Sequence, residues 1–247
     1  PMGRTEWIAR LPFASMAGSG YFAIFLTGFY ALVLVVLVSR RPVGLLRPAL
    51  GLAGLFAICL LLGSVEYDRA QLTVTMLDVG QGQCVYAESK GVTALYDCGG
   101  EDDPAVTAAS YLRSIGRFSL DILILSHYDK DHAGGVPELL ETVPVDCLYL
   151  PEPADESGLQ AEILAAAEKA GTAVSFVTTD LTLSFGSAVL SVYAPVRAEE
   201  GNNGSVSVHW RSGDFDVLLT GDMDADAEAD LLSAHGLSSI EVLAAGH

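Results

Sequence analysis

The sequence predicts an α/β fold in which two β-sheets are flanked by helices, and it predicts two membrane helices ahead of that fold. Residues 66–247 mix β-branched or alternating runs with stretches that have apolar residues at helical spacing. About 180 residues are enough to bury one core, and this mixed order favours two packed sheets with helices over an all-β barrel. Residues 1–65, in contrast, hold two long apolar runs.

The apolar runs at about residues 21–39 and 48–65 approach the roughly 20 residues that a helix needs to cross the hydrocarbon core of a bilayer. A secretory signal has a shorter apolar core and is not followed so closely by a second run. A buried helical hairpin of a soluble domain is the alternative, but neither run offers a polar face. We therefore assign residues 1–65 to a membrane segment and residues 66–247 to a separate domain.

Charge differs between these two parts. Residues 1–65 hold five of the 13 basic residues and one of the 31 acidic residues, a net charge of +4, so the remainder carries −22. Three arginines lie in the connector 39–47, an excess that is typical of the cytoplasmic side of a membrane. We expect a multi-pass protein of the cytoplasmic membrane whose domain 66–247 lies on the outer face.

Ten strands and three helices are predicted within residues 66–247. The helices are predicted at residues 104–115, 158–170 and 224–235, each followed by a glycine where a C-terminal cap belongs. The strands are predicted at residues 72–79, 84–88, 93–98, 122–125, 147–150, 174–178, 189–193, 205–209, 215–219 and 240–243. The four cysteines form no C-x-x-C pair, and each is best explained as a small buried residue.

The strongest functional signal is the loop 126–135, which directly follows the apolar strand 122–125. Within six residues it places four side chains of metal-ligand type: His127, Asp129, Asp131 and His132. Crowded this tightly, these groups repel or desolvate one another unless a multivalent cation lies between them. A solvated acidic turn is the alternative, but the paired glycines that close the loop let the backbone turn sharply at a sheet edge. The loop therefore predicts a metal site.

Two further segments repeat the layout of an apolar strand followed by a ligand-type residue. Residues 217–222 end in Asp222, and residues 242–247 end in His247. Three strand ends that present histidine or aspartate are an unusual coincidence in a structural protein.

Taken together, these motifs resemble the metallo-β-lactamase superfamily. The resemblance is carried by His127-x-Asp129-x-Asp131-His132 with its trailing glycines, Tyr96-Asp97-Cys98-Gly99, Thr220-Gly221-Asp222 and the terminal Gly246-His247. More narrowly, the chain looks like the C-terminal part of the ComEC family of DNA-uptake channel proteins. That likeness is carried by Leu77-Asp78-Val79-Gly80-Gln81-Gly82, the turn Asn202-Asn203-Gly204-Ser205 and the two preceding apolar spans.

The resemblance implies an αββα sandwich that binds two divalent metal ions at one end of its sheets. It implies that the first ion is bound by His127, Asp129 and a histidine at or just after His247. It implies that Asp131 and His132 bind the second ion, that Asp222 bridges both, and that Asp97 supports the ligands from behind. Asp131 and Asp222 are the expected catalytic residues. Substrate contacts are expected from four residues, for most of which a turn-stabilising role is the alternative: Asp78, Gln81, Asn203 and Ser205.

Three features depart from the family pattern. Asp129 stands where a histidine is usual, and a carboxylate shifts metal preference away from zinc, so the metal stays open between zinc and manganese. Gln83-Cys84 replaces the usual Asp-Ser or Asp-Ala. The chain stops at His247, whereas relatives continue with a second histidine, glycine and serine, so we expect a domain truncated at its C-terminus.

Physical chemistry favours hydrolysis as well. Two cations about 3.5–4 Å apart activate a water molecule and clamp the oxygens of a phosphoryl displacement. We predict a membrane-tethered, metal-dependent phosphodiesterase, a nuclease that degrades one strand of incoming DNA during uptake. Its expected partners are single-stranded DNA as substrate, the membrane, the channel domain of the same full-length protein and other DNA-uptake proteins.

The charge of residues 66–247 opposes a nucleic-acid substrate, because affinity for a polyanion comes mainly from lysine and arginine, and only eight are present there. One alternative therefore keeps the fold and the metals but changes the substrate to a small ester, lactam or phosphoester. A second alternative is a non-catalytic, channel-associated module in which the metal loop only stabilises the fold.

Overall fold

The computed structural model describes residues 20–38, 46–69, 71–152, 158–196, 202–237 and 239–245. The chain divides into two compact units, one formed by residues 1–70 with 114–116 and the other by residues 71–113 with 117–247.

The first unit contains a pair of helices, α2 (Gly20–Val38) and α3 (Leu46–Arg69). The two helices pack through apolar side chains, with the ring centroids of Phe25 and Phe56 4.8 Å apart. A Cβ on Gly28 would lie 3.2 Å from Leu55, so the small residue permits close approach of the helices. Helices are thus present at both predicted positions. Within the described ranges, however, no helix reaches the length and apolarity required to cross a membrane.

The second unit begins with a six-stranded sheet in the order β1-β2-β3-β4-β5-β6. Its first three strands form an antiparallel meander of β1 (Thr73–Met76), β2 (Val85–Ser89) and β3 (Val92–Tyr96). The sheet continues in parallel through β4 (Leu120–Ile124), β5 (Val145–Pro151) and β6 (Ala173–Val177). Parallel neighbours require crossover connections. These contain α4 (Pro104–Ser114), α5 (Lys130–Ala133), α6 (Val136–Thr142) and α7 (Leu159–Ala170).

A five-stranded sheet follows, in the order β11-β10-β9-β8-β7. Four strands are antiparallel: β7 (Leu181–Phe185), β8 (Ala188–Tyr193), β9 (Ser207–Ser212) and β10 (Phe215–Leu219). The short 3-10 turn η1 (Asn202–Gly204) precedes β9. Helix α8 (Ala225–His235) then leads to β11 (Val242–Ala244), which pairs in parallel with β10.

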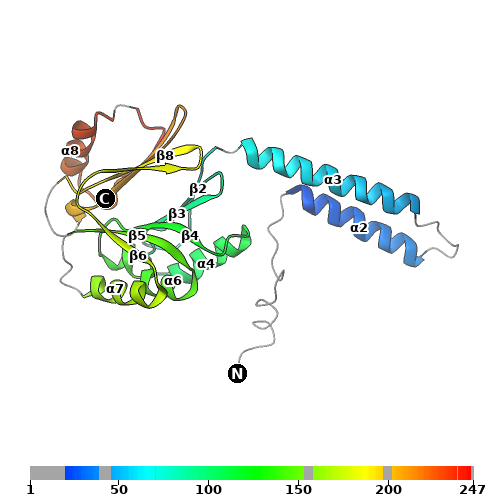
Figure 1. Ribbon diagram of the computed structural model, residues 1–247, viewed down its shortest axis with the longest axis horizontal. Coiled ribbons are helices and arrows are strands. Elements are labelled where there is room, and N and C mark those ends of the chain that lie inside the picture. The colour runs from blue at the N-terminus through cyan, green and yellow to red at the C-terminus, as the bar shows by residue number, and fades with distance from the viewer. Residues whose placement is uncertain are drawn as a thin grey trace, which may run out of the picture. The chain divides into compact units, whose positions relative to one another are not determined.

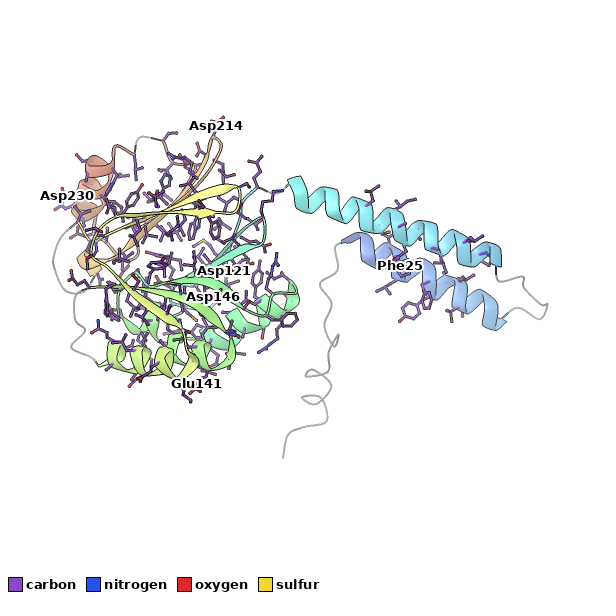
Figure 2. All side chains as sticks on the ribbon, viewed as in Figure 1. Phe25, Asp121, Glu141, Asp146, Asp214 and Asp230 are labelled. Atoms are coloured by element: carbon purple, nitrogen blue, oxygen red, sulfur yellow. The ribbon has the colours of Figure 1, made fainter. Side chains whose placement is uncertain are left out.

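The main core lies between the two sheets. Tyr96 and Ile124 from the first sheet are fully buried against apolar residues of the second, including Leu190 and Trp210. Side chains fill the space between the two layers of strands (Figure 2). Figure 1 shows α4, α6 and α7 on the outer side of the first sheet and α8 on the outer side of the second. On that second side, Leu231 of α8 is buried in a smaller apolar cluster. The predicted αββα sandwich is therefore confirmed.

The predicted helices 104–115, 158–170 and 224–235 correspond to α4, α7 and α8, and most predicted strands lie within two residues of observed ones. The first strand is shorter than predicted, since only residues 73–76 pair with β2 and the rest enters a glycine-rich loop. Strand β7 was not predicted, although its alternation of Leu181, Leu183 and Phe185 with polar residues is a strand signal. Helices α5 and α6 were also not predicted, because four and seven residues are too short to show helical periodicity.

Candidate metal centre

The metal loop begins at an edge of the first sheet where two parallel strands end. Because β3 and β4 run in parallel, Asp97, just after β3, lies beside residues 125–129, just after β4. The backbone N–H of Asp97 donates to the carbonyl of Ile124 at 2.9 Å. Asp97 has φ 60°, a left-handed conformation that aspartate tolerates better than most residues and that turns the chain out of the strand. Its carboxylate is fully buried and faces the loop.

Asp97 and Ser126 fix the protons of both loop histidines. The N–H of Ser126 donates to Asp97 Oδ1 and its hydroxyl donates to Asp97 Oδ2, both at 2.7 Å. Because the hydroxyl proton is used in this way, Ser126 Oγ accepts from Nδ1 of His127, at 2.9 Å. Nδ1 of His132 donates to Asp97 Oδ2 at 2.9 Å. The network thus assigns the proton to Nδ1 in both rings and leaves each Nε2 lone pair for a metal ion.

The Nε2 atom of His127 is the strongest sign that the site fits a metal. His127 Nε2 is buried and has no hydrogen-bond partner in the part of the chain that the structure describes. A buried polar atom left in this way is costly unless a ligand completes it. One ligand atom each of His127, His132 and Asp222 lies within 4.8 Å of the others. Two imidazoles and a carboxylate suit zinc, iron, manganese or a similar divalent ion.

The two histidines respond oppositely to their surroundings. Burial and the neighbouring His132 lower the pKa of His127, so its ring is neutral at physiological pH. Burial also lowers the pKa of His132, but the hydrogen bond and negative charge of Asp97 outweigh this, and the net pKa is raised. Protons therefore compete with metal mainly at His132.

The two other loop aspartates lie at the rim of the site. Asp129 Oδ2 is 3.5 Å from His127 Nε2, and the Asp129 side chain is 56% exposed. Asp129 is the residue before α5, yet its carboxylate makes no capping bond within the described residues, which leaves it available to a ligand. Asp131 does not belong to the group of three, but it is partly exposed and lines a cavity of about 720 Å³ together with Gln81 and Lys130.

Asp222 reaches the same site from the second sheet. It follows β10 through Gly221, whose φ of 66° favours glycine. A Cβ there would lie 2.8 Å from Ser126 and 2.9 Å from Ser205, so the absence of a side chain also lets the two sheets approach. The amide of Asn202 donates to Asp222 Oδ2 at 2.8 Å. The structure thus brings together two of the three predicted strand ends, those before His127 and Asp222, while the residue predicted after the third, His247, lies outside the described residues.

Glycines hold the loop against the rest of the sheet edge. The N–H of Gln83 donates to the carbonyl of Asp131, and the N–H of Cys98 donates to the carbonyl of His132. A Cβ on Gly99 would lie 2.2 Å from the backbone of Asp131 and His132, a distance that no side chain allows. Gly82, where a Cβ would lie 2.6 Å from the carbonyl of Asp131, and Gly99 therefore let the metal loop pack closely.

The remaining predicted residues occupy different positions. Asp78 is exposed, and Gln81 is exposed in the wall of the cavity. Ser205 is fully buried, donates to the carbonyl of Asn202 at 2.6 Å, and lies 3.5 Å from His127 Nδ1. Asn203 belongs to η1, but its side chain is outside the described set. His247 also lies outside the described residues.

Two residues of the site were missed by sequence reasoning. Ser126 has a local signal, since it lies directly before the histidine–aspartate motif at the end of a strand. Asn202 lies in the predicted Asn-Asn-Gly-Ser turn, but the sequence drew attention to its neighbour Asn203 instead. Its contact with Asp222 spans 20 residues and becomes visible only in the folded chain.

Comparisons with known proteins agree with this geometry. The family model described as "Metallo-beta-lactamase superfamily" matches residues 77–244. ComE operon protein 3 of Bacillus subtilis is 30% identical over 199 residues, which cover 70% of this chain and 25% of that protein. Recombination protein 2 of Haemophilus influenzae is 30% identical over 217 residues, covering 85% of this chain and 25% of that protein. Competence protein ComA of Neisseria gonorrhoeae is 26% identical over 221 residues, covering 87% of this chain and 30% of that protein.

The resemblance to ComEC-type competence proteins is thereby confirmed. The chain spans between a quarter and a third of the length of these relatives.

Proposed function

The chain belongs to the metallo-β-lactamase superfamily, and from this we propose that it is a metal-dependent phosphodiesterase, a nuclease that degrades one strand of incoming DNA during DNA uptake. The coarser statement, a metal-dependent hydrolase, is supported by the family and by its competence-protein relatives. The observation that carries the proposal is the convergence of His127, His132 and Asp222, together with the buried His127 Nε2, which has no hydrogen-bond partner among the described residues.

In the proposed reaction the chain's own residues prepare the site before substrate arrives. Asp97 and Ser126 keep the protons on Nδ1, so that both Nε2 lone pairs face the metal position. Asp222 supplies a negative charge from the second sheet. Asp131 lines the adjoining cavity, and we assign it with Asp222 to catalysis as an anionic ligand at the point where substrate enters. When bound, the divalent ions supply the activation of water and the stabilisation of charge on a phosphoryl oxygen.

Two ions are proposed, with zinc or manganese as the candidates. Asp129, which lies 3.5 Å from His127 Nε2, adds a hard oxygen ligand where an imidazole would favour zinc. Asp131 and His132 are proposed for the second ion, Asp222 for both, and a histidine at or after His247 for the first. Metal analysis of protein loaded with each ion separately decides between the two metals.

The proposed substrate is single-stranded DNA, as expected of a protein similar to competence proteins. The cavity beside Asp131 carries four acidic residues and one lysine among its lining residues, namely Glu101, Asp103, Asp131, Glu138 and Lys130. Figure 2 also shows acidic side chains such as Glu141, Asp214 and Asp230 projecting from the outer surface. DNA must therefore be attracted by the bound ions and by other parts of the longer protein, for which we propose the channel domain and further DNA-uptake proteins as partners.

The proposed location of the protein at a membrane rests on its sequence composition. Residues 20–38 contain no charged side chain, and the connector 39–47 holds three arginines. We propose that α2 and α3 tether the protein to the cytoplasmic membrane and that the sandwich lies on its outer face. Protease added to intact spheroplasts is then expected to digest the sandwich. Complete protection, with digestion only after lysis, would contradict the outer placement.

A small ester, lactam or phosphoester is a second candidate substrate, favoured by the acidic cavity. Metal-loaded wild-type protein is expected to cleave labelled single-stranded DNA, and Asp131→Ala or Asp222→Ala is expected to abolish cleavage. Asp121→Asn is a matched control, because Asp121 accepts two hydrogen bonds from Thr93 in the same sheet away from the loop. Cleavage that survives both alanine changes would refute the mechanism, and cleavage of small esters alone would support the second candidate. Full metal occupancy without turnover of either substrate would support a non-catalytic module.

A further inference from the structure

The Asn202–Ser205 turn lies between the two sheets at the metal site and contacts both. On the side of the first sheet, the N–H of Val206 donates to the carbonyl of Ser126 at 2.9 Å, and the hydroxyl of Tyr96 donates to the carbonyl of Val206 at 2.7 Å. The turn is closed by Ser205, whose N–H and hydroxyl both donate to the carbonyl of Asn202. The position of Asn202 is therefore set by the sheet that carries the loop histidines.

On the side of the second sheet, the same turn reaches the carboxylate ligand. Asn202 Nδ2 donates to Asp222 Oδ2 at 2.8 Å. The orientation of the amide follows from chemistry, because an ionised carboxylate only accepts hydrogen bonds and the NH₂ group must face it. Asn202 thus ties Asp222, which is carried by the second sheet, to a turn fastened to the first.

An amide is well suited to this position. Asp222 must keep its negative charge to bind a cation, and a lysine or arginine in place of Asn202 would neutralise that charge and repel the ion. A neutral donor fixes one carboxylate oxygen without cancelling the charge. Hydrogen bonds of this kind, made to a ligand by a residue that does not itself bind the metal, set ligand orientation and affinity.

We propose that Asn202 is a positioning residue for Asp222, and that it sets the affinity of the site by joining the carboxylate ligand of one sheet to the histidine ligands of the other. The inference rests on the metal site of the proposed function, but it does not depend on the substrate or on turnover.

The test is a metal-binding titration of metal-depleted protein, with a chelator as competitor. Asn202→Ala and the nearly isosteric Asn202→Leu are both expected to weaken metal affinity about 10- to 100-fold, the range seen when such supporting bonds are lost. The melting temperature of the metal-depleted variants is expected to remain close to that of wild type, while the rise on adding metal becomes smaller. Gln71→Ala is the matched control, since it removes a side-chain amide hydrogen bond, accepted from Ser212 Oγ at 3.3 Å at the end of β9 opposite the Asn202–Ser205 turn, and is expected to leave affinity unchanged.

A second measurement separates positioning from a general structural role. In an Asp222→Ala background the partner of Asn202 is absent, so Asn202→Ala is expected to cause no further loss of affinity. Wild-type affinity in the Asn202 variants would overturn the inference, and so would an equal loss in the presence and absence of Asp222. If the wild-type protein binds metal as expected but cleaves no phosphodiester, the proposed function fails while this inference stands.

Discussion

Asp97→Asn tests how strongly the buried carboxylate controls the metal ligands. Asparagine also tolerates the left-handed conformation at position 97, so the backbone is expected to be preserved. The amide oxygen can still accept from the N–H of Ser126, but its NH₂ group then replaces Oδ2, which accepts from His132 Nδ1 and from the Ser126 hydroxyl. To avoid two facing donors, His132 must move its proton from Nδ1 to Nε2, the atom needed for the metal.

The size of the effect follows from the bond that is lost. A hydrogen bond to a charged group contributes about 1.5–3 kcal/mol, and each 1.4 kcal/mol corresponds to tenfold in affinity. We therefore expect Asp97→Asn to bind metal about 10- to 150-fold more weakly than wild type, measured by chelator competition. Asp121→Asn is the control, because its two bonds from Thr93 converge on one oxygen that an amide can replace. Wild-type metal affinity in Asp97→Asn, with normal folding, would refute the assignment of protons in this network.

Three further predictions concern His209 in β9, Gly99 beside the metal loop and Ser126 at the start of that loop. Burial lowers the pKa of His209 below its usual 6.5, so between the two values the unfolded chain binds a proton that the folded chain does not. The free energy of unfolding of metal-free protein should therefore fall as pH drops below 6.5, and His209 should contribute up to about 1.4 kcal/mol per pH unit to this fall. Denaturant titrations of His209→Phe should show a shallower fall with pH. An equal slope in both proteins would exclude His209 as the cause. Gly99→Ala should displace the loop backbone, lower the free energy of unfolding by about 1–3 kcal/mol and abolish tight metal binding, measured by chelator competition. Gly54→Ala, whose Cβ would have no heavy atom within 4 Å, should leave metal binding intact in the same measurement. Ser126→Ala removes the acceptor of His127 Nδ1 and should weaken metal binding about tenfold; unchanged affinity would show that the serine does not orient the ring.

The sandwich was predictable because its signals are local. Alternating strands and glycine caps are properties of short windows, and they located α4, α7, α8 and most strands. The metal loop was predictable for a related reason, since its four ligand-type residues lie within six consecutive residues. The alternation in β7 was equally local, so its omission was an error of interpretation rather than a limit of the sequence.

The contacts that orient the ligands were not predictable in the same way. Asp97 and Ser126 are 29 residues apart, and Asn202 and Asp222 are 20 apart, so their hydrogen bonds depend on strand order and on the approach of two sheets. Nothing in the sequence distinguishes Asn202 from Asn203. In the structure, the amide of Asn202 donates to Asp222 of the second sheet, in a turn that Ser205 closes.

The central claim is that side chains from separate strand ends jointly bind divalent metal. It is tested most directly by measuring the metal content of purified protein by mass spectrometry after loading with zinc or manganese and removal of unbound ion. Wild-type protein should retain two ions per chain, and Asp222→Ala, which removes the carboxylate that the second sheet contributes, should retain fewer. Retention of no metal by wild type, or of the same amount by Asp222→Ala, would contradict the account.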